Sequence, residues 1–466
     1  MRRFVHSLVA AARHASGAAP AICVLALLVW TSWQQLLVSL RVLEWDSHVF
    51  ILMGRWWLDG VWPYRDVREL KPPGIFVYLA SVFAILPDAL WSVRIGNWLL
   101  ACASAVAAFV FLRRQVGLLA AFLGAGAWSY WSAHASFVWG GLYTEQYAAS
   151  AMWVACVLAI SRRPLAAGAA VGVAALFKHP AATVLLPVAW LLGAQAIPRM
   201  LVGLVAVLLP TAAVAWLVPG MWQPFVECNW TALLSHGEIG TGAPWTTRLG
   251  QLWVSVVDLA RRFPFASLFV VAGVATAPAA AVLWFFADLL AVVAQRNFYE
   301  HHWILAFPSA IWIASTALRR PLIAALAILI LAAWLPGYWN AMAPNTRLAW
   351  QQWTSGNWPV VPGRPFEDEV GRYVRARTVT GDRISLFGWN ASGLAIYWSA
   401  ERLPASRHFF GMCCGISAET LMAETERNKP AALVLVGIPD DSPLRSWLER
   451  AYAFDRRFTA DYTADV

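Results

Sequence analysis

Two acidic residues occupy positions where they could perform chemistry at a membrane surface. Asp46 lies just beyond the first long apolar segment, where a carboxylate is costly to desolvate and can accept a proton from an incoming nucleophile. A helix cap or a charge that extends to the interface explains this position equally well. Glu145 begins another apolar segment, so it fits either a contact with the helix dipole or a second acidic group opposite Asp46.

Two of the three lysines are candidate phosphate ligands. The chain has 35 Lys and Arg residues, and only positions 71, 178 and 429 are lysines. A lysine ammonium is a compact charge that suits a phosphate, whereas a single lysine at a helix end often only extends to the interface. Lys71 precedes Pro72 and Pro73, which favour an extended backbone before them and a new helix after them. Both roles stay open for Lys71 and Lys178.

Polar and aromatic side chains near these residues are candidate substrate contacts. They are Tyr64, Arg65, Glu69, Tyr143, His301 and His302. Two adjacent histidines on a helix are expected to face different directions, and the HHW sequence lacks the HExxH spacing of zinc proteases. We therefore expect His301 and His302 to bind phosphate or sugar hydroxyls. The sequence predicts no certain cofactor and no metal ligands, although it leaves room for a divalent cation.

The cysteines add no second candidate for metal or redox chemistry. All six lie outside any CxxC pattern, so they indicate neither a metal nor a haem framework. Cys413 and Cys414 are adjacent, and a disulfide between neighbours closes a strained ring. We expect this pair to serve packing.

The composition excludes a water-soluble single domain. The 466 residues are 60% hydrophobic and 13% charged, whereas soluble domains carry about 25% charged residues. A membrane-spanning helix needs about 20 mostly apolar residues, and short helices can be accommodated inside a bundle. The apolar segments predict about 11 crossings, near 20–40, 90–112, 117–133, 147–161, 164–177, 181–196, 200–218, 264–277, 279–295, 302–318 and 321–339.

The net charge of +9 follows from an asymmetry between alternate connections. With the N-terminus in the cytoplasm, the inner connections carry ten arginines and no acid, namely Arg2, Arg3, Arg13, Arg113, Arg114, Arg162, Arg163, Arg199, Arg319 and Arg320. Residues 41–73 carry five charges of each sign, and residues 340–466 carry fourteen of each. This positive-inside pattern explains the excess without a nucleic acid partner. It places the C-terminal residues outside the cytoplasm.

The sequence predicts a membrane module, 1–345, followed by a small extracytoplasmic α/β domain, 346–466, which we call the tail. The first apolar segment is expected to be retained rather than cleaved as a signal peptide, because no small-residue cleavage site follows it. Helix-like runs at 366–379, 417–428 and 444–451 alternate with strand-like runs at 384–388 and 432–437. The tail has no GxGxxG or P-loop sequence, so no nucleotide site is expected.

Three outer loops, 41–89, 134–146 and 219–262, are longer than simple connectors and are therefore expected to carry function. Residues 46–59 of the first are predicted to form a juxtamembrane helix in the interface plane. The third loop contains Trp222, Trp230, Trp245 and Trp253, with His236 and Glu238 among its polar groups. Indole rings suit sugars and membrane interfaces equally.

In their order and spacing these segments resemble the GT-C superfamily of integral membrane glycosyltransferases. The likeness is greatest to the protein O-mannosyltransferase and aminoarabinose-transferase branch. The matching elements are Asp46, GVWPYRD (60–66), KPPG (71–74), SVRIGN (92–97), YTE (143–145), FKHPA (177–181), HHWILAFP (301–308) and LFGWNASGLAIYWSAERLPASRHF (386–409). The resemblance implies a polytopic fold with juxtamembrane helices in the first outer loop. It also implies an active site at the outer bilayer surface and a polyprenyl-phosphate sugar as donor.

The same resemblance implies residue roles. Asp46 would be the base that activates the acceptor, and Glu145 would be the second acidic group. Lys71 would meet the donor phosphate, with Lys178 and His302 beside it. Ser47 and His48 stand where the family commonly continues its aspartate with a glutamate, so the sequence does not support a metal role for the first loop.

We therefore predict an inverting glycosyltransferase of the bacterial inner membrane whose acceptor is a hydroxyl of a lipid, polysaccharide or protein. A lipid-linked sugar flippase or transporter is the first alternative. The chain shows no internal repeat and few ionisable residues within its apolar segments, of which Asp288 is the clearest, and both features disfavour transport. A non-catalytic scaffold is the second alternative, and it predicts that Asp46 can be replaced without loss. The sequence identifies neither the sugar nor the acceptor.

Overall fold

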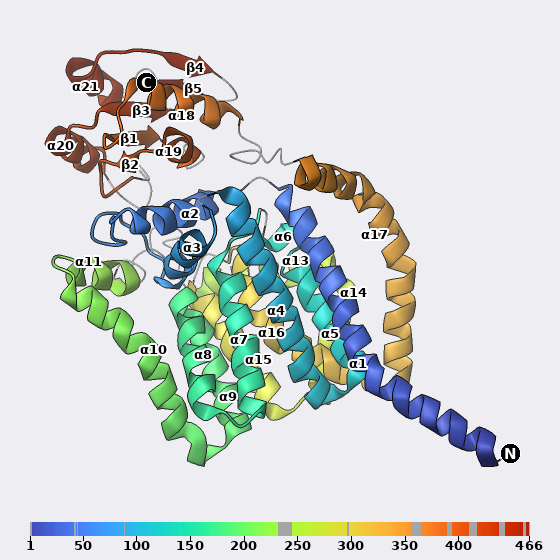
Figure 1. The fold of residues 1–466 in the computed structure, drawn as a ribbon. Coiled ribbons are helices and arrows are strands. Elements are labelled where there is room, and N and C mark those ends of the chain that lie inside the picture. The colour runs from blue at the N-terminus through green and yellow to red at the C-terminus, as the bar shows by residue number, and fades with distance from the viewer. Residues whose placement is uncertain are drawn as a thin grey trace.

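A helical bundle forms most of the molecule, and a five-stranded sheet lies at one end of it (Figure 1). The computed structural model describes residues 2–41, 43, 45–87, 89–138, 140–231, 245–295, 298–355, 365–388, 394–409, 417–437, 443–459 and 463–465. Cys413 and Cys414, His236 and Glu238, and the middle of the 386–409 motif lie outside these residues. The predictions that concern them therefore stay predictions.

A helix lies in each of the apolar segments named above. These helices are α1 (Arg2–Ser39), α4 (Leu90–Val116), α5 (Leu118–Trp131), α7 (Thr144–Ile160), α8 (Pro164–Phe177), α9 (Leu185–Leu192), α10 (Ile197–Leu217), α14 (Pro264–Val274), α15 (Ala279–Gln295), α16 (Phe307–Ala317) and α17 (Pro321–Ser355). Within the described residues, four helices are long and apolar enough to cross a membrane: 17–39, 90–116, 194–217 and 321–355. The chain thus has the architecture of a helical membrane protein, while the number of crossings stays a prediction.

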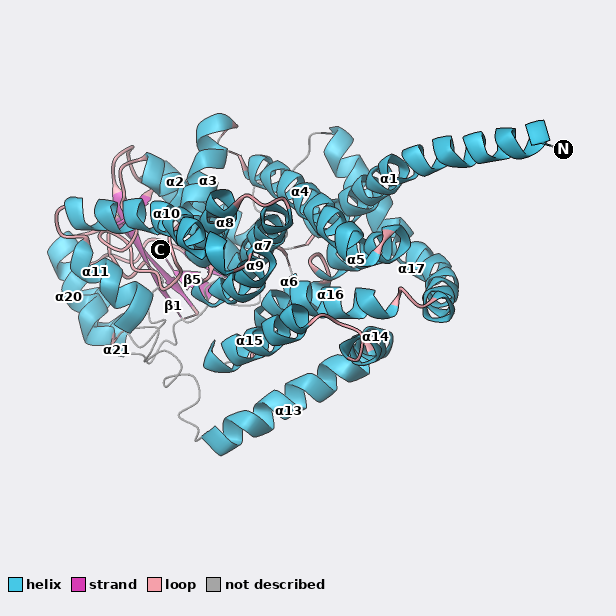
Figure 2. Ribbon diagram, turned by 90° about the horizontal axis from the view of Figure 1, so that it is seen from below, coloured by secondary structure: helices cyan, strands magenta, loops and turns pink. Residues whose placement is uncertain are grey.

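Several shorter elements connect these helices. The 3-10 helices are η1 (His179–Val184), η2 (Ala194–Ala196) and η4 (Glu300–Ala306), and the short α6 (Ala135–Val138) precedes α7. The third outer loop, predicted as a loop with four tryptophans, contains α11 (Trp222–Val226), a π-helical turn η3 (Glu227–Thr231) and the amphipathic α13 (Trp245–Arg262). Figure 2 shows α13 at the edge of the bundle, beside α14.

The first outer loop forms two helices, α2 (Trp45–Leu58) and α3 (Gly74–Ile85), which pack against each other across one end of the bundle (Figure 1). They approach closely at Gly54, where a Cβ atom would lie 2.6 Å from the Cβ of Leu79. The α2 helix corresponds to the helix predicted at 46–59. The loop between α2 and α3 carries Tyr64, Glu69 and Lys71, so the packing of these helices sets the position of three candidate residues.

The fold predicts a strong effect of a small substitution at Gly74. A Cβ atom there would lie 2.6 Å from the carbonyl oxygen of Leu176 in α8, so a side chain forces α3 away from α8. We expect Gly74→Ala to lower the free energy of unfolding by about 1–3 kcal/mol, measured by thermal unfolding in detergent. Gly250→Ala is the control, because a Cβ atom at that described glycine meets nothing within 4 Å. Equal stability of the two variants would contradict this packing.

The tail contains a mixed sheet in the order β2-β1-β3-β5-β4. Its strands are β1 (Arg383–Gly388), β2 (Leu403–Pro404), β3 (Ala432–Val436), β4 (Arg457–Thr459) and β5 (Thr463–Asp465). Strand β1 pairs in parallel with β2 and β3, whereas β5 runs antiparallel to both β3 and β4. The apolar strands β1 and β3 lie where the sequence predicted strands. Strands β2, β4 and β5 have two or three residues each, too few to show a pattern in sequence.

Four helices accompany this sheet in the described residues, and all but α19 lie where the sequence predicted a helix. They are α18 (Pro365–Arg377), α19 (Leu394–Ala400), α20 (Ala418–Asn428) and α21 (Pro443–Ala451). Apolar side chains of β1, β3, α20 and α21 form one small core, made of Phe387, Leu421, Leu433, Leu435, Trp447 and Leu448. The predicted boundary at 345/346 falls inside α17, because that helix continues to Ser355, beyond the end of its apolar segment.

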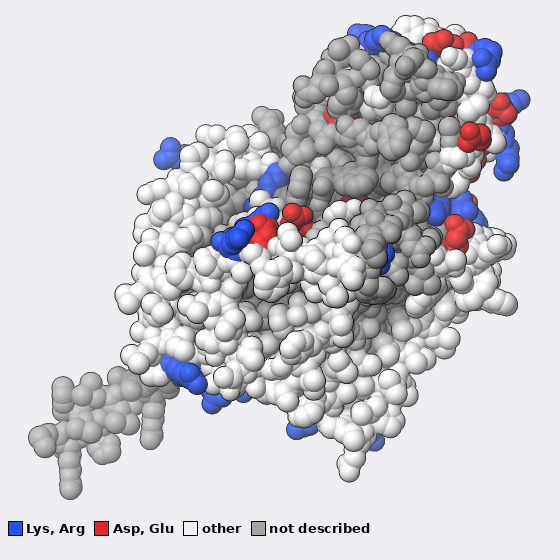
Figure 3. Space-filling model, turned by 180° about the vertical axis from the view of Figure 1, so that it is seen from behind, with Lys and Arg blue, Asp and Glu red and all other residues white. Residues whose placement is uncertain are grey.

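Charged residues are distributed unevenly over the face of the molecule in Figure 3. At the end of the bundle far from the tail, this face shows Lys and Arg but no Asp or Glu. Charges of both signs gather on the tail and where the bundle meets it. This distribution agrees with the charge asymmetry of the sequence and directs attention to the boundary between bundle and tail.

Candidate active site

Breaks and ends of helices bring the predicted site residues to one end of the bundle. Asp46 lies in the first turn of α2, and Lys71 lies in the turn that precedes α3. Glu145 lies in the first turn of α7, ahead of the segment predicted to cross the membrane. Lys178 separates α8 from η1, and the two histidines lie in η4. Helix ends present side chains without an intrahelical neighbour on one side, so these positions can converge.

Asp46 and Lys71 form the first ion pair of the site. The Lys71 Nζ lies 3.5 Å from Asp46 Oδ2, and both side chains are about one-fifth exposed, at 24% and 20%. The hydroxyl of Tyr64 donates a hydrogen bond of 2.7 Å to the carbonyl oxygen of Lys71. The pair is therefore open to a ligand, and the lysine is fixed from its backbone.

Glu145 and Lys178 form a second, buried ion pair. The Lys178 Nζ lies 2.7 Å from Glu145 Oε1, and the glutamate side chain is only 1% exposed. Burial alone would raise the pKa of Glu145, but the ammonium of Lys178 and the nearby histidines lower it well below its ordinary value. Burial lowers the pKa of Lys178, and the Glu145 carboxylate opposes that shift. Each charge thus keeps the other ionised.

The two pairs lie within electrostatic reach of each other. The charge of Lys71 helps to lower the pKa of both Glu145 and Lys178, and Asp46 acts on Lys178 in the opposite direction. Glu69 is half-buried beside the first pair, and desolvation raises its pKa while Lys71 opposes the shift. The site therefore combines two lysines with three carboxylates.

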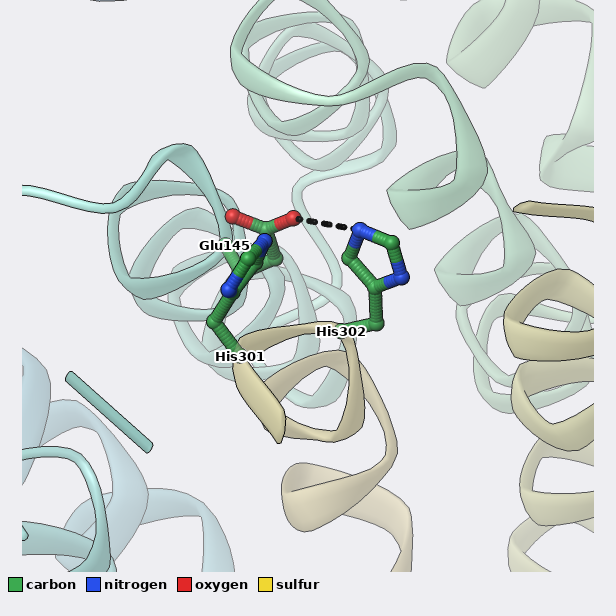
Figure 4. A group of neighbouring side chains, drawn as sticks. All are labelled: Glu145, His301 and His302. Carbon is green, nitrogen blue, oxygen red and sulfur yellow. Dashed lines mark ion pairs between the residues drawn. The ribbon is translucent and has the colours of Figure 1, made fainter. Parts of the chain in front are cut away.

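His301 and His302 both converge on Glu145 (Figure 4). His302 Nε2 lies 3.9 Å from Glu145 Oε1, and the two imidazole centroids are 4.6 Å apart with the rings almost perpendicular. The prediction that adjacent histidines would face different directions is wrong, because both side chains of the tight η4 turn reach the same carboxylate. Burial lowers the pKa of His301 to about 4, so its imidazole is neutral at pH 7.

These three side chains are a possible set of metal ligands. One ligand atom from each of Glu145, His301 and His302 lies within 4.8 Å of the others, and imidazole with carboxylate suits a divalent cation. Lys178, however, already occupies Glu145 Oε1 at 2.7 Å. The other oxygen, Oε2, accepts a hydrogen bond of 3.0 Å from the hydroxyl of Thr144. A cation bound here would lie beside the Lys178 ammonium, and the repulsion between their like charges disfavours a resident metal.

A stack of aromatic rings extends from the histidines. The ring of Tyr143 stacks on His301 with centroids 4.4 Å apart and planes 16° from parallel. Tyr299 stacks on the same imidazole at 5.5 Å. Tyr143 and His301 were predicted as substrate contacts, whereas Tyr299 was missed, although its place two residues before His301 was a signal. Such ring faces can hold a sugar or a prenyl chain.

The structure separates the three remaining candidates. Tyr64 is fully buried, so its hydroxyl positions Lys71 and does not reach a ligand directly. Arg65 is occupied by its neighbour Asp66, which accepts hydrogen bonds of 2.8 and 2.7 Å from it. Among the described contacts, nothing joins Arg65 to the two ion pairs. Glu69 lies close enough to Lys71 for the lysine charge to oppose the rise that burial causes in the pKa of the glutamate.

Comparison with known proteins shows the fold. No protein-family model and no curated protein matches the chain. ArnT from Cupriavidus metallidurans bound to undecaprenyl phosphate is similar, with a TM-score of 0.56 and 15% identity over 96% of this chain and 98% of that chain. ArnT in the apo state matches with a TM-score of 0.55 and 14% identity, over 95% of this chain and 97% of that chain. An oligosaccharyltransferase from Archaeoglobus fulgidus, in complex with Zn and sulfate, matches with a TM-score of only 0.43 and 13% identity, over 88% of this chain and 67% of that chain. The chain thus has the fold of ArnT, in agreement with the fold that the sequence resemblance implied.

Proposed function

We propose that this chain is an inverting glycosyltransferase that moves a sugar from a polyprenyl-phosphate donor to an acceptor hydroxyl. One observation carries the proposal: two carboxylate–lysine pairs, Asp46 with Lys71 and Glu145 with Lys178, lie together at the tail end of the bundle. The fold supports a lipid phosphate as leaving group, because ArnT, which shares it, has been seen with undecaprenyl phosphate. A flippase would have no need of a base beside a phosphate-binding lysine.

In this mechanism the donor phosphate separates the first pair. The phosphate takes the Lys71 ammonium and so frees the Asp46 carboxylate, which then accepts the proton of the acceptor hydroxyl. The acceptor oxygen attacks the anomeric carbon from the side opposite the phosphate. A new carbon–oxygen bond forms as the bond to the phosphate oxygen breaks, and the electron pair leaves with polyprenyl phosphate.

The second pair would stabilise the charge that develops on the leaving phosphate. Lys178 and the imidazole of His302 point toward the same carboxylate, and both can donate to phosphate oxygens. Because Glu145 is ionised and buried, it holds Lys178 and His302 in place before the polyprenyl-phosphate sugar binds. Tyr143, His301 and Glu69 are proposed to contact the sugar. The proposed mechanism uses neither a metal nor a nucleotide.

The proposal includes a location for the reaction. With the arginine-rich connections in the cytoplasm of a bacterial cell, the tail and both ion pairs lie on the outer side of the inner membrane. A donor that arrives within the bilayer and an acceptor from the extracytoplasmic space would then meet between bundle and tail. The acceptor is a hydroxyl of a lipid, a polysaccharide or a protein.

The test is the release of polyprenyl phosphate by purified protein in lipid nanodiscs, with a panel of radiolabelled polyprenyl-phosphate sugars and a membrane extract as acceptor. We expect release that depends on acceptor, and a product of inverted anomeric configuration. A covalent glycosyl-enzyme or a product of retained configuration would contradict the mechanism. Movement of donor across proteoliposomes without release would support the flippase.

A further inference from the structure

A short segment of the tail contacts the loop that carries Lys71. The Nε of Arg407 donates a hydrogen bond of 3.1 Å to the carbonyl oxygen of Tyr64, and the amide of Arg68 donates one of 2.8 Å to the carbonyl oxygen of Arg407. Glu227, at the start of η3, lies 3.7 Å from Arg407 Nη2 and 3.4 Å from Arg68 Nε. The segment thus joins the first outer loop, the third outer loop and the tail.

Tyr64 connects this contact to the active site. Its backbone has a φ of 69°, in the left-handed region that a tyrosine rarely adopts, and its side chain is fully buried. Such a conformation persists only where neighbouring contacts determine it. The carbonyl oxygen of Tyr64 accepts the hydrogen bond from Arg407, and its backbone amide donates one of 2.8 Å to the carbonyl oxygen of Val67. Its hydroxyl donates one of 2.7 Å to the carbonyl oxygen of Lys71.

The tail holds Arg407 firmly on its own side. The hydroxyl of Ser406 and Nδ1 of His408 both contact the carboxylate of Glu424 in α20, the latter at 2.9 Å. The side-chain Nδ2 of Asn428, also in α20, donates a hydrogen bond of 2.6 Å to the carbonyl oxygen of Ala405. The residues on either side of Arg407 are therefore anchored to a helix of the tail, and its guanidinium extends from a fixed base.

Separate apolar contacts seat the tail on the bundle. The ring of Trp56 in α2 packs edge-on against Tyr397 and Phe409, with centroids 5.3 and 5.2 Å apart. The guanidinium of Arg55 lies 4.9 Å from the ring centroid of Trp398. Because these contacts do not involve Arg407, loss of its side chain leaves the main seating surface in place.

We infer that Arg407 is a positioning residue for the donor phosphate site, and that it acts on Lys71 through Tyr64. The tail is then a structural part of the phosphate site and not only its cover. The consequence for catalysis rests on the proposed function, whereas the coupling of tail to Lys71 does not. Arg407 closes the LPASR stretch (403–407) of the 386–409 motif, and the Arg407–Tyr64 contact gives that stretch this role.

The test uses full-length protein in nanodiscs and compares Arg407→Ala with Arg375→Ala. Arg375 is the matched control, because it pairs with Glu401 inside the tail. Without any substrate, amide exchange of residues 62–71 is expected to accelerate in Arg407→Ala only, while exchange in β1 and β3 stays unchanged. Unchanged exchange in 62–71 would overturn the inference, and faster exchange in β1 and β3 as well would do so by showing that the tail had come loose.

A second measurement tests the path through Tyr64. Titration with undecaprenyl phosphate is expected to show a Kd raised about 3- to 10-fold by Arg407→Ala and by Tyr64→Phe, the effect of one hydrogen bond each. If Arg407 acts on Lys71 through Tyr64, the double variant should bind undecaprenyl phosphate no more weakly than the weaker-binding of the two single variants. A Kd of the double variant raised by the product of the two single-variant factors would overturn the path through Tyr64. Because neither readout is turnover, a failure of the proposed transferase activity is distinguishable from a failure of this inference.

Discussion

Replacing Asp46 with asparagine is expected to lower the rate of sugar transfer by about 10²- to 10⁴-fold, the usual contribution of a general base. The amide keeps the size of the carboxylate but cannot accept the proton of the acceptor hydroxyl. Binding of donor should persist, since Lys71, the residue proposed to contact the phosphate, is unchanged. The fold should persist as well, because the pair is partly exposed and spans 3.5 Å, and such pairs contribute about 1 kcal/mol or less.

The measurement is release of polyprenyl phosphate in nanodiscs, with donor binding determined on the same preparation. Asp59→Asn is the matched control, because it makes the same chemical change in the exposed turn that follows α2. We expect that control to retain the wild-type rate. Equal turnover by Asp46→Asn and wild type would remove Asp46 from the mechanism and direct attention to Glu145 as the base.

Short-range patterns in the sequence were sufficient to place the long apolar helices and to single out charged residues that pair with each other in the structure. Apolar segments of helical length indicated α1, α4 and α10, because burial in lipid requires a continuous apolar surface. The scarcity of lysine singled out Lys71 and Lys178, and the structure places each beside a predicted acid. These features depend on composition within one segment, which a sequence displays directly.

Long-range contacts were beyond such patterns. The convergence of His301 and His302 on Glu145 depends on the tight turn η4 and on its contact with α7, more than 150 positions earlier in the chain. Tyr64 was expected to contact substrate, but its left-handed backbone and buried hydroxyl give it a supporting position. The role of Arg407 required knowing where the tail lies on the bundle. In each case tertiary packing decides what a side chain can reach.

The second large effect concerns the buried pair. Glu145→Gln is expected to lower the free energy of unfolding by about 3–5 kcal/mol, because it leaves the Lys178 ammonium buried without its partner. Lys178→Met should lower the free energy of unfolding by a similar amount, because it leaves the Glu145 carboxylate buried without its partner. The double variant Glu145→Gln with Lys178→Met should recover most of that stability, since it buries no unpaired charge. Transfer should stay low in all three, because each lacks a charged group that is proposed to bind or orient the phosphate.

Acidification provides an independent check of the same pair. The pKa of Glu145 lies below its ordinary value, so the pair stabilises the fold above the pH at which the unfolded carboxylate ionises, and this contribution is lost as the pH falls. The stability difference between wild type and Glu145→Gln should therefore be constant from about pH 6 to 8 and shrink below about 4.5.

Thermal and denaturant unfolding in detergent would measure these differences, with Glu401→Gln as the control. Glu401 pairs with Arg375 at 2.6 Å, but both side chains are about half exposed, so its loss should cost less than about 1 kcal/mol. If Glu145→Gln were as stable as this control, the pair would not be buried in solution. If the double variant were no more stable than the single ones, the loss would come from packing and not from an uncompensated charge. Recovery of stability without recovery of transfer is the result that would separate the electrostatic role of Glu145 and Lys178 in catalysis from their role in the fold.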